Sequence, residues 1–226
     1  MASFFSWLPS ILFPPSCVGC SRRGTGLCAD CAVQVPPAPS LEEPRMFALY
    51  LYGYPLVAKA VRDLKYHHKR DGAEALLRYG VPRLSEWLAD VLLSEQPEKM
   101  VLVPIPQHQS KTHERGFSQS LLLARALSRK LDGATISQAL RKRRHTVPQV
   151  CLKNRKERLA NLIETMETKK ALDPSVLYIV VDDVITTGAT VREATRALEK
   201  GGARRILAVA LAHGYANQHY LSRYSQ

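Results

Sequence analysis

The sequence has little negative charge compared with its positive charge. Of its 226 residues, 32 are Lys or Arg and only 20 are Asp or Glu, which gives a formal net charge of +12. An excess of this size creates a positive field that attracts polyanions, so a nucleic acid or polyphosphate partner is expected, with a merely solvated surface as the alternative. The content of 46% hydrophobic and 23% charged residues excludes a mostly disordered chain and indicates a folded globular protein.

The sequence also lacks an apolar run long enough to cross a bilayer, which takes roughly 20 residues. The longest candidate, ASFFSWLPSILFPP, is shorter than this and contains prolines. It also lacks the basic residue that precedes the apolar part of a secretion signal. We therefore expect a cytoplasmic protein without a transmembrane segment. The apolar side chains of this stretch would pack on the domain, or rest on the inner face of the membrane as a peripheral contact.

Cysteine is scarce outside one short window, CVGCSRRGTGLCADC. Four of the five cysteines lie there as two CxxC pairs, namely Cys17, Cys20, Cys28 and Cys31. Each pair directs two thiolates toward one point, and four thiolates match a closed tetrahedral zinc site. An iron–sulfur cluster is one alternative, and two disulfides, which a reducing compartment disfavours, are the other. We predict structural Zn²⁺, which would fold a segment too short to bury its own core.

Apolar patterns predict an α/β protein with a parallel sheet flanked by helices. Strands are expected at MFALYLYGY, KMVLVPIP, SVLYIVVDD and RILAVALAH, and helices at PLVAKAVRDLKYHH, FSQSLLLARALSRKL and VREATRALEKG. A further helical pattern over residues 73–93 is interrupted by Gly80 and Pro82. The proline-rich QVPPAPSLEEP reads as a linker. We therefore expect a zinc-binding module over residues 1–44 and a sheet domain over residues 45–226.

Residues of about 134–170 lack this alternation, and we expect them to form a hood over the sheet edge. Within the hood, residues 141–158 contain eight Lys or Arg and the single acid Glu157. A solvated face is the usual reading of a basic run, but so many cations repel one another unless an anion lies among them. Single-stranded nucleic acid fits, although aromatic residues for base stacking are absent from this run. The candidate contacts are Arg141, Lys142, Arg143, Arg144, Arg155 and Arg158.

The stretch YIVVDDVITTGAT places Asp182 and Asp183 at the end of a buried strand, where ligands bind in an open parallel sheet. The following turn, residues 186–190, enters a helix whose free backbone N–H groups attract a phosphate. No lysine follows Gly188, so this is not a Walker-type loop. Carboxylates bind hydroxyls or Mg²⁺ rather than phosphate, so the pattern predicts a site for a sugar phosphate. A simple helix cap, the alternative, needs only one of these polar side chains.

VVDDVITTGAT closely resembles the phosphoribosyl pyrophosphate motif of type I phosphoribosyltransferases. With CVGCSRRGTGLCADC, LKYHHKRDGAEAL and VPIPQHQSKTHERGFSQSLLLARAL, it makes the chain similar to the ComF family of competence-associated proteins. In that family a four-cysteine zinc finger precedes a phosphoribosyltransferase domain, and the family is linked to the handling of single-stranded DNA in natural transformation. The chain has Ser118 where the family usually has Asn, and LIETM where it often has GAF.

The resemblance implies a role for individual residues. Asp182 and Asp183 would hold the ribose 2′ and 3′ hydroxyls. The 5′-phosphate would be bound by the turn, formed by Thr186, Thr187, Gly188, Ala189 and Thr190. Arg115, Gly116 and Lys65 would contact the pyrophosphate, with Mg²⁺ sharing its charge. A nucleophile would displace pyrophosphate at ribose C1 in a pentosyl transfer, and DNA-processing proteins of transformation would be partners.

Three functions remain open on the sequence. The first is a ComF-type phosphoribosyltransferase that acts in DNA uptake, and the second is a metabolic phosphoribosyltransferase for a nucleobase or another small acceptor. The third is a DNA-binding adaptor without catalysis. The cysteine cluster and the basic run favour the first over the second, and the complete acid and threonine pattern argues against the third.

Overall fold

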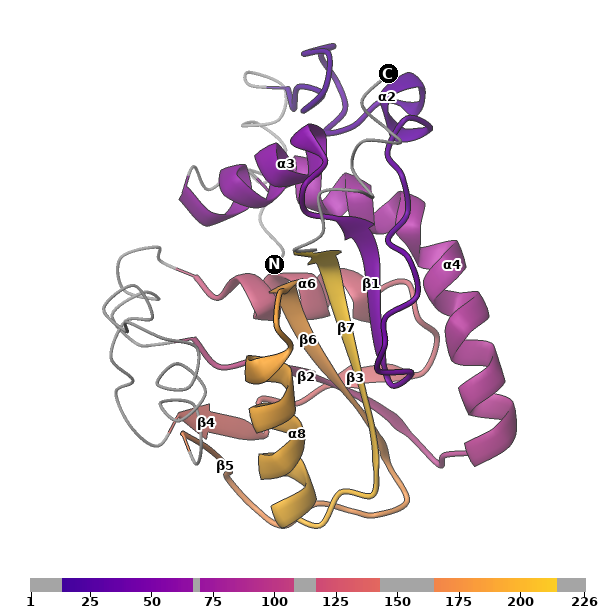
Figure 1. Ribbon diagram of the computed structural model, residues 1–226, viewed down its shortest axis with the longest axis vertical. Helices are drawn as coiled ribbons and strands as arrows, with labels where there is room; N and C mark the ends of the chain where they lie inside the picture. Colours follow the sequence, from indigo (N-terminus) through magenta and orange to yellow (C-terminus); the bar gives the residue numbers. More distant parts are fainter. Residues whose placement is uncertain (1–13, 67–69, 108–116, 143–164, 215–226) are drawn as a thin grey trace, which may run out of the picture.

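The computed structural model describes residues 14–66, 70–107, 117–142 and 165–214, and its central element is a parallel sheet (Figure 1). The sheet has five strands in the order β1-β7-β6-β2-β3. Its strands are β1 (Met46–Leu51), β2 (Met100–Pro104), β3 (Ala134–Ile136), β6 (Leu177–Ile185) and β7 (Arg205–His213). Neighbouring strands are all parallel, as the sequence predicted.

Helices cover both faces of the sheet, because its central strands are apolar on both sides. In β6, Leu177 and Ile179 pack into one core cluster while Tyr178 and Val180 pack into the other. The first cluster includes α3 (Pro55–Tyr66), α4 (Asp71–Glu95) and α6 (Gln119–Ser128). The second includes α8 (Ala189–Lys200) and the small antiparallel sheet of β4 (Leu140–Lys142) and β5 (Met166–Thr168).

α4 continues without a break through Gly80 and Pro82, where the sequence predicted an interruption. That prediction was wrong because the buried side chains Leu76, Leu84 and Leu88 hold the helix on the sheet on both sides of the proline. Gly80 allows the close approach, since a Cβ there would lie 2.8 Å from Leu49 Cδ2 of β1. Tertiary packing therefore overrides the local preference.

The segment expected to form the hood begins with a strand of the main sheet. Ala134–Ile136 is β3, which pairs with β2 at the sheet edge. β4 and β5 pair with each other, and residues 143–164, which lie between them in sequence, are outside the described part of the chain. The hood over residues of about 134–170 stays a prediction.

The cysteine module packs against α3 and α4 (Figure 1). Leu27 is fully buried, and Lys59 of α3 donates a hydrogen bond to the carbonyl of Val18 at 2.9 Å. Since the module and the sheet share one core cluster, they pack as one body, and the division near residue 44 stays a prediction. The short helix α2 (Ala29–Ala32) lies within the module. Residues 1–13, with their expected core or membrane contact, lie outside the described residues.

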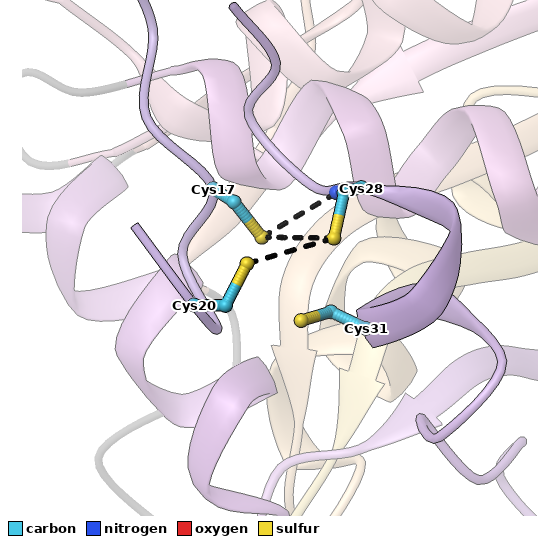
Figure 2. A group of neighbouring side chains, drawn as sticks. All are labelled: Cys17, Cys20, Cys28 and Cys31. Carbon is cyan, nitrogen blue, oxygen red and sulfur yellow. Dashed lines mark hydrogen bonds between the residues drawn. The ribbon is translucent and has the colours of Figure 1, made fainter. Parts of the chain in front are cut away.

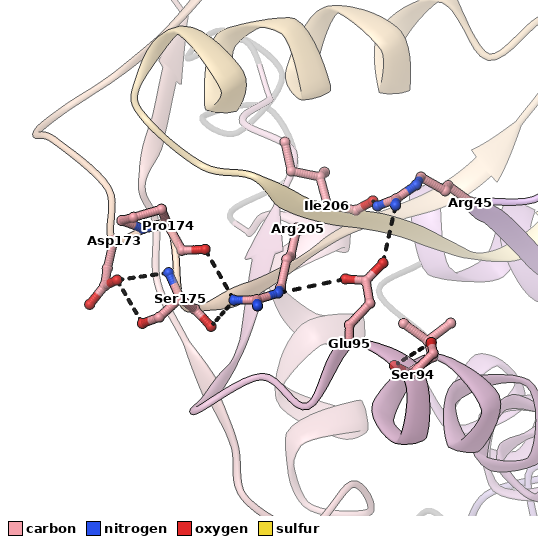
Figure 3. Close-up of polar contacts among 9 residues, drawn as sticks. Arg45, Ser94, Glu95, Asp173, Pro174, Ser175, Arg205 and Ile206 are labelled. Atoms are coloured by element: carbon pink, nitrogen blue, oxygen red, sulfur yellow. Dashed lines mark hydrogen bonds and ion pairs between the residues drawn. The ribbon is translucent and has the colours of Figure 1, made fainter.

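A polar network joins the elements at the amino ends of β1 and β7 (Figure 3). Glu95, at the end of α4, contacts Arg45 at 3.1 Å and Arg205 at 4.0 Å. Arg205 also donates to the carbonyl of Ser175 at 3.0 Å, just before β6. The network lies at the opposite ends of the strands from Asp182 and Asp183, so we assign it to the architecture. None of the described helices is both long and apolar enough to cross a membrane.

Candidate functional site

The acidic pair lies where neighbouring parallel strands send the chain to opposite faces of the sheet. The chain leaves β2 for α6 on one face and β6 for α8 on the other. Pairing between β2 and β6 ends at Val181, so Asp182 and Asp183 extend past the end of β2. A crevice outside the carboxyl ends of two such strands is the usual ligand position in an open α/β sheet.

The backbone fixes one oxygen of each carboxylate. Oδ1 of Asp182 accepts a hydrogen bond from the N–H of Asp183 at 2.9 Å, and Oδ1 of Asp183 accepts one from the N–H of Val184 at 2.8 Å. The other oxygen of Asp183, Oδ2, lies 2.7 Å from Nζ of Lys65. Lys65 comes from the last turn of α3, so the fold brings together two regions that are distant in sequence.

The pair concentrates negative charge in a poorly solvated place. Burial raises the pKa of Asp182 to about 8, the charge of Asp183 acts in the same direction, and Lys65 opposes it. Two adjacent carboxylates of this kind ionise together only when cations are close to them. The arrangement can therefore hold hydroxyl groups, or a divalent cation that supplies the missing positive charge.

The turn expected to bind phosphate lies between β6 and α8. Gly188 adopts the left-handed conformation, with φ of 72°, which lets the chain enter the helix directly after the strand. The hydroxyl of Thr187 accepts a hydrogen bond from the N–H of Ala189 at 3.4 Å, and the side chains of Thr186 and Thr187 are exposed. Ala189 and Thr190 open α8, so their N–H groups belong to the first helical turn, where anions are stabilised.

Two residues that sequence reasoning missed support this turn. Arg192 donates to the carbonyl of Thr187 at 2.5 Å and pairs with Glu43 at 2.6 Å, so it ties the turn to the chain before β1. Gly214 follows β7 and donates to the carbonyl of Ile185 at 2.7 Å, and a Cβ there would lie 2.8 Å from Cγ2 of Thr186. The sequence held a local indication only for Arg192, which lies one helical turn after Gly188, and none for Gly214.

His213 ends β7 beside the same turn. Burial lowers its pKa, although a hydrogen bond with the backbone of Thr186 acts in the opposite direction. The imidazole is therefore neutral over a wider pH range than an exposed histidine. Its contact with the turn suits a structural role there.

The loop after β2 is described only at its ends, and the predicted pyrophosphate contacts Arg115 and Gly116 lie outside the described residues. At one end, the hydroxyl of Ser120 donates to the carbonyl of Ile105 at 2.6 Å. At the other, Ser118 caps α6 by accepting from the N–H of Leu121. Ser118 thus performs a capping task for which Asn is also suited.

The candidate nucleic-acid contacts are described only in part. Arg141 in β4 pairs with Glu167 in β5 at 2.8 Å, and its side chain is 61% exposed. Lys142 ends β4. Arg143, Arg144, Arg155 and Arg158 lie outside the described residues. Of these candidates, the structure thus describes only Arg141, which is paired with an acid, and the adjacent Lys142.

The four cysteines converge on one point (Figure 2). Their sulfur atoms all lie within 4.8 Å of one another, and Sγ of Cys28 is 3.7 Å from Sγ of both Cys17 and Cys20. A Zn–S bond of about 2.3 Å in a tetrahedral site requires sulfurs about 3.8 Å apart, whereas a disulfide requires about 2.05 Å. The cysteines are free thiols, so the geometry fits a structural zinc site and disagrees with two disulfides.

The backbone around the cluster favours the thiolate form of Cys17. Burial opposes ionisation of Cys17, but hydrogen bonds from the backbone of Cys20, Cys28 and Gly19 lower its pKa to about 6. The hydrogen bond with Cys28 and burial raise the pKa of Cys31 to about 12 when the metal is absent. Gly19 leaves room for the sulfurs, since a Cβ there would lie 2.7 Å from Sγ of Cys31.

Residues 118–224 match the family model described as the phosphoribosyl transferase domain. Competence protein F of Haemophilus influenzae is 33% identical over 113 residues, which are 49% of each chain. DNA utilization protein YhgH of Escherichia coli K12 is 29% identical over 205 residues, 84% of this chain and 85% of the relative. Competence protein ComFC of Bacillus subtilis is 36% identical over 117 residues, 51% of this chain and 45% of the relative.

The matches thus span about half the length of the two competence proteins and most of the length of YhgH. The matched domain contains the whole of β6, the turn and α8, so it includes the acidic pair whose geometry is described above. The chain therefore contains a phosphoribosyl transferase domain and is homologous to competence proteins F and ComFC and to YhgH, as its resemblance to the ComF family predicted.

Proposed function

We propose that the protein binds phosphoribosyl pyrophosphate together with Mg²⁺ and handles single-stranded DNA during DNA uptake. The observation that carries the proposal is the acidic pair beside the 186–190 turn, at the point where β2 and β6 send the chain to opposite faces. The names of the relatives, two competence proteins and a DNA utilization protein, support the cellular role.

Each part of the site has a separate task. Asp182 and Asp183 hold the ribose hydroxyls through the carboxylate oxygens that the backbone does not hold, and the threonine turn with the first N–H groups of α8 holds the 5′-phosphate. Lys65 is within reach of the acidic pair, and Arg115 and Gly116 belong to the loop that would approach the pyrophosphate. Mg²⁺ bound with the ligand supplies positive charge at the pyrophosphate oxygens.

Such a site promotes pentosyl transfer mainly by position and charge. The sugar is held at two ends, so ribose C1 is presented in a fixed orientation to an attacking group. Cationic side chains stabilise the negative charge that develops on the leaving pyrophosphate. Asp182 and Asp183 steady the ribose while positive charge develops on its ring.

The cysteine cluster contributes to the fold. Four thiolates leave no open position on Zn²⁺, so the metal would hold the module in shape against α3 and α4. Cytoplasmic conditions keep such thiolates reduced, which agrees with a protein that meets imported DNA strands at the inner face of the membrane. DNA-processing proteins of transformation would be its partners there.

The sugar-phosphate site is tested by isothermal titration of phosphoribosyl pyrophosphate with Mg²⁺. The double variant Asp182→Asn with Asp183→Asn should lose binding, while Asp90→Asn, on the exposed side of α4, should bind like the natural protein. Equal affinity in the double variant and the natural protein would contradict the site.

Whether the site transfers the sugar is tested by pyrophosphate release with candidate acceptors. Single-stranded DNA and free nucleobases are compared in the same assay. Release that depends on a nucleobase alone would favour a metabolic phosphoribosyltransferase, and tight ligand binding without any release would favour the adaptor.

A further inference from the structure

Lys65 is placed at the acidic pair by the packing of α3. One side of this helix buries Val57, Ala60, Val61 and Leu64 in the core cluster that it shares with α4. Leu64 is 1% exposed, so the phase of the last turn is fixed, and the adjacent Lys65 reaches Asp183. The side chains of Lys65 and Asp183 are 22% and 11% exposed, which makes this a largely desolvated ion pair.

The position of the ammonium group conflicts with ligand binding. Nζ of Lys65 lies 2.7 Å from Oδ2 of Asp183, while Oδ1 of the same carboxylate accepts the N–H of Val184. Oδ1 of Asp183 thus has a backbone donor, whereas the buried Oδ2 has the ammonium as its ion-pair partner but accepts no hydrogen bond from the described residues. A divalent cation at Oδ2 would meet a like charge, and a sugar hydroxyl would compete with the ion pair.

On the basis of the proposed sugar-phosphate site, we infer that Lys65 is an internal counter-ion that ligand binding must displace from Asp183. In the ligand-free protein, the ammonium supplies the positive charge that a divalent cation would otherwise supply to the acidic pair. When the ligand binds, Asp183 exchanges the ammonium for a sugar hydroxyl or Mg²⁺. The released ammonium then faces the anionic groups of the ligand.

This exchange makes the site selective among ligands, which neither Asp183 nor Lys65 would achieve alone. A free divalent cation gains Asp183 but leaves Lys65 without an anion in a poorly solvated place, which is unfavourable. A ligand that brings hydroxyls, a divalent cation and a pyrophosphate group satisfies both residues at once. The counter-ion therefore disfavours free metal ions and sugars without a pyrophosphate group.

The test measures two affinities on the full zinc-loaded chain. Mn²⁺ alone is followed by electron paramagnetic resonance, and phosphoribosyl pyrophosphate with Mg²⁺ by calorimetry. For Lys65→Met, we expect Mn²⁺ to bind about tenfold tighter or more and the sugar ligand to bind about tenfold weaker or more. Lys65→Arg keeps the charge and should stay close to the natural protein in both measurements.

Lys130→Met, at an exposed position after α6, controls for the loss of a positive charge elsewhere. The double variant Lys65→Met with Asp183→Asn should lose the gain in Mn²⁺ affinity, which locates the gain at Asp183. A merely structural lysine would lower both affinities together.

If Lys65→Met binds Mn²⁺ with unchanged or lower affinity, the inference that Lys65 is a counter-ion of Asp183 is wrong. If the natural protein fails to bind phosphoribosyl pyrophosphate, the proposed function fails instead, and the Mn²⁺ comparison alone decides the role of Lys65.

Discussion

Glu193 of α8 accepts a hydrogen bond from the backbone N–H of Met166, the first residue of β5, at 3.0 Å. Arg196 pairs with Glu193 at 2.7 Å and donates to the carbonyl of Met166 at 3.2 Å. The buried Glu193 thus binds the backbone N–H of Met166, and the neighbouring Arg196 binds its carbonyl. β5 and α8, the helix that follows the 186–190 turn, are thereby joined.

The substitution Glu193→Gln should lower the free energy of unfolding by about 1–3 kcal/mol, because it removes the negative charge that pairs with Arg196 and weakens the contact with Met166. Urea unfolding measures this change. Glu199→Gln, which removes an exposed acid of the same helix, should alter stability by less than about 0.5 kcal/mol. Equal stabilities of the two variants would contradict the role of Glu193.

Asp182 predicts a pH dependence of stability. Its pKa is raised from 3.8 to about 8 in the folded protein, so the folded chain holds this proton more tightly than the unfolded chain. The protonated carboxyl of Asp182 therefore stabilises the folded protein, and this stabilisation is fully present below about pH 4 and is lost as the pH rises toward 8. In Asp182→Asn, this part of the slope should disappear from unfolding measured between those pH values. Parallel curves for the two proteins would show that other groups cause the slope.

The cysteine cluster predicts about one zinc per chain in metal analysis. Cys17→Ser should lose the metal and lower the melting temperature, because the cluster packs on α3 and α4. Cys151→Ser, which removes the fifth cysteine outside the two CxxC pairs, is the matched control and should keep the metal. Iron in place of zinc, or retention of zinc by Cys17→Ser, would count against the assignment.

Gly188→Ala should weaken the binding of phosphoribosyl pyrophosphate. Its φ of 72° is costly for alanine by roughly 1–2 kcal/mol, and a Cβ there would lie 2.9 Å from Nη1 of Arg192, which braces the turn. Gly133 has nearly the same φ, 73°, with open space around its Cβ position. Gly133→Ala therefore carries a similar backbone cost far from the turn and should leave affinity unchanged. A similar loss in both variants would mean that stability, rather than the turn, controls binding.

The basic run predicts salt-dependent binding of single-stranded DNA. The triple variant with alanine at Lys142, Arg143 and Arg144 should bind more weakly. The slope of the logarithm of the binding constant against the logarithm of the salt concentration should become shallower by up to about 0.7 for each phosphate contact that is lost. This choice leaves the pair of Arg141 and Glu167 intact. Alanine at the exposed Arg125, Arg129 and Lys130 removes the same charge from another surface. Fluorescence anisotropy that shows equal affinity and equal slope for the two triple variants would exclude the basic run as the DNA surface.

Local patterns in the sequence predicted where the acidic pair and the four cysteines lie. The apolar run of β6 is long enough to be buried on both faces, and Asp182 and Asp183 follow it directly, so their place at the carboxyl end of a strand was determined by the pattern alone. The spacing of the cysteines likewise predicted that Cys17, Cys20, Cys28 and Cys31 would converge. In both cases the functional groups are close in sequence, and the local backbone decides where they lie.

Other features depended on contacts between distant segments. Pro82 predicted a break in α4, but buried leucines on both sides keep the helix continuous. The apolar pattern of Ala134–Ile136 is too short to predict a strand. These residues form a strand because they pair with β2. Propensity is a weak guide where burial on a sheet supplies more free energy than the local preference costs.

The sequence by itself thus determined which residues form the acidic pair, the threonine turn and the cysteine cluster. Only the tertiary structure decided that Lys65 pairs with Asp183, that Glu193 holds Met166 and that Arg192 supports Thr187. These partners depend on the order of the strands and on the faces that α3 and α8 bury. Packing sets both across the whole chain, so no local stretch of sequence specifies them.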